Sequence, residues 1–121
     1  MYSLINPEVI FHFFDEDPQM VNEMVGIIIS TNIQELRGLG GVFESGNFFQ
    51  VKKKCHKSKP SMSYLGAIKV RGTLEKIEEN VEASFERYYP HLLQELDLLE
   101  KELGLFLDHI NSTGEVNTQI N

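Results

Sequence analysis

The chain has 121 residues, enough for one domain, and a formal net charge of −7 that argues against general nucleic-acid binding. Hydrophobic residues make up 41% and charged residues 24% of it, so we expect a soluble globular protein with a buried core. The single cysteine, Cys55, excludes an intramolecular disulfide. No basic and apolar leader opens the sequence, and no apolar run could span a bilayer. We therefore expect a cytoplasmic protein that does not interact with membranes.

Basic residues gather in one short stretch of this acidic chain. Residues 52–59 read Lys-Lys-Lys-Cys-His-Lys-Ser-Lys and hold 5 of the 11 basic residues and none of the 18 acidic ones. A basic stretch around a histidine suggests a local anion site. A lysine-rich helix face that is simply solvated would give the same composition.

Apolar residues recur at helical spacing along most of the chain, without sustained alternation. Asn6-Pro7 predicts the cap and first residue of a short helix over 7–14, and Asp17-Pro18 predicts the start of a longer one over 18–37. The glycines at 38, 40 and 41 are expected to end that helix. Its expected buried stripe comprises Met20, Val21, Met24, Val25, Ile28, Ile29 and Leu36.

Three further helices are predicted in the rest of the chain. Asn47 is the expected cap of the third, which carries the basic stretch and has Phe48, Val51 and Cys55 on one face. The fourth is expected from 66 or 67, with an apolar stripe of Val70, Leu74, Ile77 and Val81. The fifth is expected from Tyr89-Pro90, with a stripe of Leu92, Leu96, Leu99, Leu103, Phe106 and Ile110.

Four long amphipathic helices with short connections predict an all-α fold. We expect an antiparallel, up-down four-helix bundle with a short N-terminal capping helix. Residues 1–121 would form one domain, with the bundle core at about 15–110. The polar residues 111–121 are expected to form a frayed tail.

The most specific pattern lies between His56 and Ala67. Lys59 follows the histidine by three positions, Ser61 by five, and an apolar residue then precedes Gly-Ala in Leu65-Gly66-Ala67. The turn Gly46-Asn47 lies about nine positions before the histidine. This pattern resembles the signature of histidine-phosphotransfer (HPt) domains, and the resemblance covers about residues 15–110.

The resemblance implies a phosphorelay carrier of two-component signal transduction. Such a carrier accepts a phosphoryl group on His56 from a receiver-domain aspartate and passes it to another receiver. Its partners would be receiver domains of response regulators or hybrid histidine kinases, and a monomer is the default. No cofactor is expected on this chain, because the Mg²⁺ of the reaction belongs to the receiver. By the same resemblance, Ser61 would orient the site and Gly66 would allow two helices to approach closely.

The spacing gives this chemistry a physical rationale. His56 and Lys59 share one helix face, so a neutral imidazole nucleophile lies beside a mobile positive charge that can stabilise the phosphoryl group. Lys52, Lys53 and Lys57 would add a weaker, salt-screened field that suits docking on the acidic pocket of a receiver. With Pro60 and Gly66, these lysines form the expected docking surface for the partner.

Pro60 departs from the family, which usually has glycine four residues after the histidine, where the partner approaches. Proline cannot donate the helical hydrogen bond to the carbonyl of His56, and its ring crowds that carbonyl. We therefore predict a kink or an early helix end directly beside His56. Two other side-chain groups are interpreted as structural: Cys55 as a core residue, and the acidic residues Glu75, Glu78, Glu79 and Glu82 as a solvated helix face.

Two other functions stay open at this point. The domain would be an adaptor that docks on a receiver or histidine kinase without carrying phosphate, or a helical scaffold whose basic stretch binds another anion or an acidic protein. No glycine-rich phosphate loop or ATP-binding motif is present, so we do not expect a kinase. No pair of histidines has metal-ligand spacing with a carboxylate beside it, so no metal site is expected.

Overall fold

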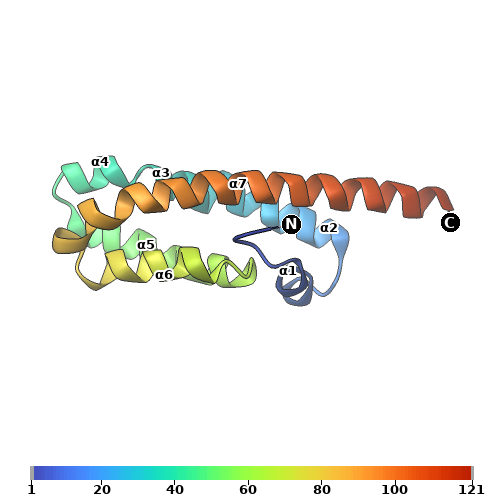
Figure 1. The fold of residues 1–121 in the computed structure, drawn as a ribbon, viewed down its shortest axis with the longest axis horizontal. Coiled ribbons are helices and arrows are strands. Elements are labelled where there is room, and N and C mark those ends of the chain that lie inside the picture. The colour runs from blue at the N-terminus through green and yellow to red at the C-terminus, as the bar shows by residue number, and fades with distance from the viewer. Residues whose placement is uncertain (1, 121) are drawn as a thin grey trace.

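The structure is a computed structural model that describes the backbone of residues 2–120 and the side chains of residues 2–112. Within that part of the chain all regular elements are helices, which confirms the predicted all-α class (Figure 1). One of them, η1, is a π-helical turn. The elements are α1 (Pro7–Phe13), α2 (Pro18–Ile28), η1 (Ile29–Ile33), α3 (Gln34–Arg37), α4 (Leu39–Glu44), α5 (Phe48–Tyr64), α6 (Ile68–Glu79) and α7 (Val81–Ile120).

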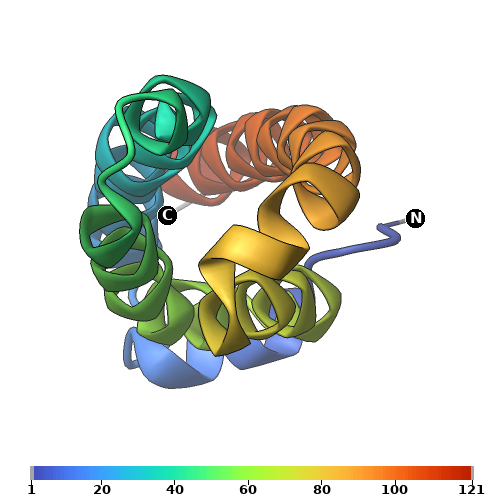
Figure 2. The same cartoon turned by 90° about the vertical axis from the view of Figure 1, so that its left-hand side faces the viewer.

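The longer helices lie alongside one another around a common core. α5 packs on α6, α6 packs on α7, and the segment α2–η1–α3 lies against α7. Seen end-on, these segments surround a shared centre (Figure 2), while α7 runs the length of the molecule and extends past the others (Figure 1). The centre is filled by apolar side chains from every long helix, among them Val21, Val25, Val51, Cys55, Met62, Leu74, Ile77, Leu96, Leu99 and Leu103.

Three of the predicted helix starts are confirmed by their caps. The Asn6 side chain accepts a hydrogen bond from the backbone N–H of Glu8, and Asp17 accepts from Gln19 and Met20. Asn47 accepts from Gln50 at the start of α5. Each cap satisfies a backbone donor that the first helical turn leaves free.

The predicted buried stripe of the second helix is partly wrong. Met20 and Met24 are 41% and 37% exposed, whereas Val21 and Val25 are fully buried. Beyond Ile28 the next buried residue is Ile33, five positions on, because the π-helical turn η1 adds a residue to that turn. Before that turn, Val21, Val25 and Ile28 form the buried face, and each methionine lies one position before one of these valines.

One predicted boundary is confirmed and another differs. The helical segment that begins at Pro18 ends at Arg37, with Gly38 as its C-cap, and Gly40 and Gly41 lie in the separate short helix α4. The last helix begins at Val81 rather than at Tyr89-Pro90, and the Asn80 side chain accepts a hydrogen bond from the N–H of Ala83. Pro90 is exposed inside α7. The helix continues through it because the buried side chains on both sides keep the helix packed on the core.

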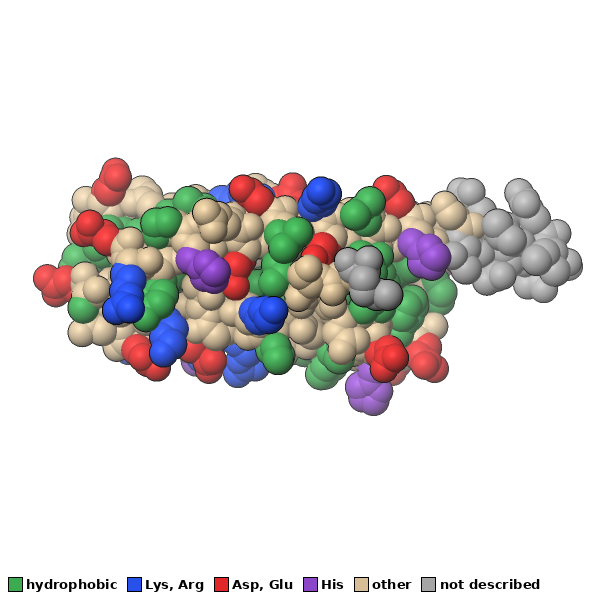
Figure 3. All heavy atoms as spheres, in the orientation of Figure 1, with side chains coloured by type: hydrophobic (Ala, Val, Ile, Leu, Met, Phe, Trp, Pro, Cys, Tyr) green, Lys and Arg blue, Asp and Glu red, His purple; other side chains and the backbone are tan. Residues whose placement is uncertain are grey.

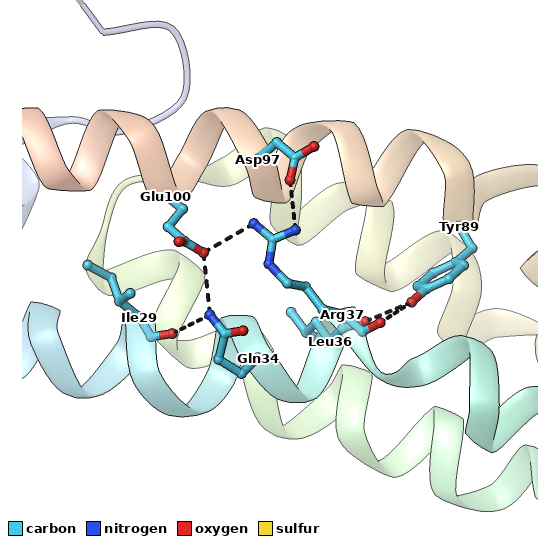
Figure 4. Close-up of polar contacts among 7 residues, drawn as sticks. All are labelled: Ile29, Gln34, Leu36, Arg37, Tyr89, Asp97 and Glu100. Atoms are coloured by element: carbon cyan, nitrogen blue, oxygen red, sulfur yellow. Dashed lines mark hydrogen bonds and ion pairs between the residues drawn. The ribbon is translucent and has the colours of Figure 1, made fainter.

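A polar cluster fastens the end of α3 to α7 (Figure 4). The Tyr89 hydroxyl donates to the backbone oxygen of Arg37 at 2.6 Å, and the Arg37 guanidinium pairs with Asp97 at 2.7 Å and Glu100 at 3.1 Å. Burial raises the pKa of Tyr89 above its ordinary value. The hydroxyl therefore stays protonated and donates.

The N-terminal segment is held on α7 by a buried carboxylate. Glu102 accepts hydrogen bonds from the backbone N–H groups of Ser3, Leu4 and Ile5 at 2.7, 2.9 and 3.1 Å. No helix in the described part of the chain combines the length and apolar character needed to cross a bilayer. The fraying expected for 111–121 concerns a stretch whose side chains, from 113 on, lie outside the described residues.

Candidate functional site

Helix α5 presents His56 at the surface. Its buried face comprises Val51, Cys55, Ser58 and Met62, which pack toward the core. His56 lies about 100° around the helix from Cys55, and its side chain is 70% exposed. The imidazole is therefore accessible while its helix is firmly packed.

The expected end of the helix at Pro60 is wrong, because α5 continues through it to Tyr64. Pro60 removes one hydrogen bond, the one that its N–H would donate to the carbonyl of His56. The next turn is held by the buried side chains of Met62 and Leu65, and the N–H of Leu65 donates to the carbonyl of Ser61 at 3.2 Å. These contacts keep His56 and Lys59 on the same helix.

Glu78 of α6 joins His56 to Lys59. Its Oε2 lies 2.6 Å from Nδ1 of His56, and its Oε1 lies 2.8 Å from Nζ of Lys59. The side chains of Glu78 and Lys59 are each only 14% exposed. Since an ionised carboxylate can only accept, Nδ1 of His56 must donate, and the imidazole lone pair is left on the exposed Nε2.

The carboxyl group of Glu78 is held in its ionised form. Burial raises its pKa, but hydrogen bonds and charge from Lys59 and His56 outweigh that effect and place the pKa below its ordinary value. Glu78 is therefore a carboxylate near neutral pH, able to orient the imidazole and to stabilise positive charge on it.

Glu78 was missed by the sequence reasoning, which assigned it to a solvated helix face. Glu75, Glu79 and Glu82 are exposed as predicted, but Glu78 points at α5. Helical spacing offered a sign of this difference, because Glu78 alone of the four lies four positions after Leu74 and three before Val81 of the apolar stripe. The antiparallel packing of α5 on α6, which also joins Ser63 to Arg71 by a hydrogen bond, then brings Glu78 to His56.

Three lysines of the basic stretch form ion pairs with two carboxylates, Glu35 and Glu78. Glu35 of α3 lies 3.2 Å from Lys54 and 3.7 Å from Lys57, and the hydrogen bond from Lys54 lowers its pKa. Lys59 pairs with Glu78. Lys52 and Lys53 are exposed and form no ion pair with any residue whose side chain is described. The free positive charge of α5 thus lies toward its N-terminal end.

Ser61 contacts α2–η1–α3 rather than the imidazole. Its hydroxyl donates to Oδ1 of Asn32 at 3.2 Å, and Nδ2 of Asn32 donates to the hydroxyl of Ser58 at 3.3 Å. Asn32 belongs to the π-helical turn η1. Ser61 can therefore influence His56 only indirectly, by holding α5 in place against η1.

Gly66 makes a close approach to the N-terminal segment. Its φ is +68°, and a Cβ built on it would lie 2.6 Å from Cβ of Asn6. The N–H of Asn6 donates to the carbonyl of Leu65 at 2.9 Å. The absence of a side chain at Gly66 thus makes room for Asn6, and not for a second long helix as expected.

These contacts define the candidate site: His56 as nucleophile, Glu78 as the carboxylate that orients it, and Lys59 as the adjacent cation. No family model, curated protein or solved structure matches this chain. The chemistry of the site is therefore argued from its own geometry.

One other reactive side chain, Cys55, lies next to His56 in the sequence. Cys55 is fully buried, and burial raises the pKa of its thiol to about 12, so it is not a thiolate nucleophile. Among the described residues, no three histidine, cysteine or acidic side chains gather closely enough to hold a metal ion.

Proposed function

We propose that this chain is a phosphorelay carrier that accepts a phosphoryl group on Nε2 of His56 from a receiver-domain aspartate and passes it to another receiver. The observation that carries the proposal is the Glu78 carboxylate, which lies 2.6 Å from Nδ1 of an imidazole that is 70% exposed. In the proposed fold, α2–η1–α3, α5, α6 and α7 form an antiparallel four-helix bundle, and α1 is a short cap at one end.

The bonds formed and broken in the phosphoryl transfer are accounted for by His56 and the receiver's aspartyl phosphate alone. The lone pair on Nε2 attacks phosphorus, the P–O bond to the receiver's aspartate breaks, and the aspartate leaves as a carboxylate. The proton on Nδ1 stays in place, and Glu78 stabilises the positive charge that develops on the ring. Lys59 shares the Glu78 carboxylate with His56, and it would exchange part of its contact with Glu78 for the incoming phosphoryl oxygens.

A docking surface would surround the imidazole. Lys52, Lys53, Lys57 and Pro60 are exposed on α5. The positive charge of the three lysines complements an acidic receiver pocket, mainly by speeding encounter. Gly66 faces Asn6, so we leave it out of this surface. The Mg²⁺ that neutralises the phosphoryl group would be held by the receiver.

The test is to incubate the protein with a receiver that carries a radiolabelled aspartyl phosphate. The proposal predicts label on this chain that is acid-labile and base-stable, absent from His56→Gln and retained by His12→Gln, which changes another exposed histidine. Label that persists in His56→Gln would contradict it. Receiver binding that survives His56→Ala, without transfer from any receiver tested, would identify an adaptor instead.

A further inference from the structure

An exposed aromatic ring lies on the same face of α5 as His56. The side chain of Phe49 is 71% exposed, and Phe49 precedes His56 by seven positions in the same helix. In an α-helix this spacing separates two residues by about 10.5 Å along the axis and by only about 20° around it. Lys53 lies between them, four positions after Phe49 and three before His56. The face of α5 that presents the imidazole therefore continues to Phe49.

A shallow hollow of about 300 Å³ lies beside Phe49, at the end of the molecule where α5 begins and α6 meets α7 (Figure 1). Three apolar side chains line it, those of Phe48, Phe49 and Val81. The polar residues that line it are Lys52, Glu78, Glu79, Asn80 and Glu82. At this end of the molecule acidic, basic and hydrophobic side chains lie close together (left in Figure 3). Apolar surface inside a polar rim is the usual make-up of a protein–protein contact.

Glu78 connects this hollow to the candidate site. It lines the hollow, and its carboxylate lies 2.6 Å from Nδ1 of His56. A partner that transfers a phosphoryl group to Nε2 must place its aspartate against His56. A stable interface covers about 800 Å² on each partner, which corresponds to a disc of about 16 Å radius. Since Phe49 is about 10.5 Å from His56 along the helix, a contact area centred on His56 includes Phe49.

The free charge of α5 lies on the same side of His56. Lys52 and Lys53 precede the histidine and form no ion pair with any residue whose side chain is described. Lys57 and Lys59 follow it, and each is paired with a carboxylate. An acidic partner surface is therefore attracted to the half of α5 that also exposes the aromatic ring.

We propose that Phe49 anchors the receiver, which places an apolar side chain against the Phe49 ring in this hollow while its aspartate faces Nε2 of His56. This inference rests on the proposed phosphorelay function, because the receiver is the partner that must cover His56. Phe49 does not touch the reacting atoms. It should therefore change how tightly a receiver binds and not how fast a bound receiver transfers its phosphoryl group.

The experiment measures phosphoryl transfer at increasing concentrations of a labelled receiver, and calorimetric binding of the same receiver without phosphate. Aromatic residues near the centre of an interface contribute much of its binding energy. Phe49→Ala should therefore raise the half-saturating concentration and the Kd at least about tenfold, with an unchanged rate at saturation. The effect should persist at high salt, which screens charges but not an apolar contact.

Two further variants control this comparison. Phe49→Leu keeps an apolar side chain and should restore most of the affinity. Leu105→Ala removes a side chain that is 54% exposed on α7, and it should change neither the Kd nor the transfer rate. Circular dichroism of each variant verifies that the helices are intact.

The outcomes that overturn this inference are distinct from those that overturn the proposed function. An unchanged Kd in Phe49→Ala, with transfer to the wild type intact, would overturn the inference alone. A lower rate at saturation with an unchanged Kd would also overturn it, because Phe49 would then act on the chemistry of His56. If the wild type bound a receiver without taking up label, the phosphorelay function would fail, and the calorimetric comparison would still decide the role of Phe49. If it neither bound a receiver nor took up label, both would fail.

Discussion

Nδ1 of His56 and Oε2 of Glu78 lie 2.6 Å apart, although the two residues are 22 positions apart in the sequence. The contact crosses from α5 to α6 and fixes which ring nitrogen carries the proton. It leaves Nε2 free on the solvent side, and Glu78 also holds Lys59 beside the ring. One carboxylate thus sets both the tautomer of the nucleophile and the place of the nearest cation.

Replacing Glu78 with glutamine should slow phosphoryl transfer while His56 remains accessible. A charge-assisted hydrogen bond contributes about 1.5–3 kcal/mol, so the rate should fall by about 10- to 100-fold. Rapid-quench measurements with a phosphorylated receiver give this rate. Glu79→Gln is the matched control, because Glu79 is exposed on the same helix and should leave the rate unchanged.

Acid should remove the stabilisation that Glu78 provides. Because its folded-state pKa is depressed, its contribution is present above the ordinary carboxyl pKa of about 4.3 and is lost as the pH falls through the folded value. Urea unfolding gives the free energy of unfolding at pH 7 and at pH 3. This free energy should fall less between pH 7 and pH 3 in Glu78→Gln than in the wild type. An unchanged loss would mean that the contacts to Lys59 and His56 do not stabilise the fold.

Three helix starts were predictable from sequence because their caps act locally, whereas the start of α7 at Val81 was missed although Asn80 caps it in the same way. Asn6, Asp17 and Asn47 each bond to a backbone N–H two or three positions on, so the residue type and the following proline or apolar run suffice. The continuation of α7 through Pro90 was not predictable, since tertiary burial on both sides overrides a local penalty.

Only part of the candidate site was predictable from sequence, because local spacing fixes some of its residues and tertiary packing fixes the others. His56 and Lys59 belong to one helix and share a face by spacing alone. Glu78 comes from another helix, and its role depends on the register of α5 against α6. Met20 and Met24 were misplaced because Val21, Val25 and Ile28 form the buried face of α2. The π-helical turn at 29–33, which no sequence pattern marked, shifts the buried positions that follow it.

Pro60→Ala should stabilise the protein. Alanine restores the N–H that can donate to the carbonyl of His56, which favours a helix interior by about 3 kcal/mol over proline. Greater freedom of the unfolded chain offsets about 0.4–1 kcal/mol of that gain, so we expect a net increase of about 2 kcal/mol. Urea denaturation measures it. A loss of stability would show that α5 is packed in a shape that requires proline.

The thiol of Cys55 should be inert in the folded protein. It is fully buried, and its pKa of about 12 leaves almost no thiolate near neutral pH. A thiol reagent such as 5,5′-dithiobis(2-nitrobenzoic acid) should react only after urea unfolding, with one equivalent per chain. Rapid reaction of the native protein would place Cys55 at the surface.

Tyr89→Phe should loosen the junction of α3 and α7. The substitution removes the hydroxyl that donates to the carbonyl of Arg37 at 2.6 Å (Figure 4), at an expected cost of about 1–2 kcal/mol. Thermal unfolding measures the change. Tyr64→Phe is the control, since Tyr64 has an exposed side chain elsewhere on the molecule, and its unfolding temperature should stay close to that of the wild type.

The central claim is that Nε2 of His56 is the atom that carries the phosphoryl group. Phosphorus-31 NMR of the chain, labelled with nitrogen-15 in histidine and phosphorylated by a receiver, tests it directly. We expect one phosphoramidate resonance, coupled to Nε2 and absent from His56→Gln. A phosphoryl group bound to Nδ1, or to any residue other than His56, would contradict it.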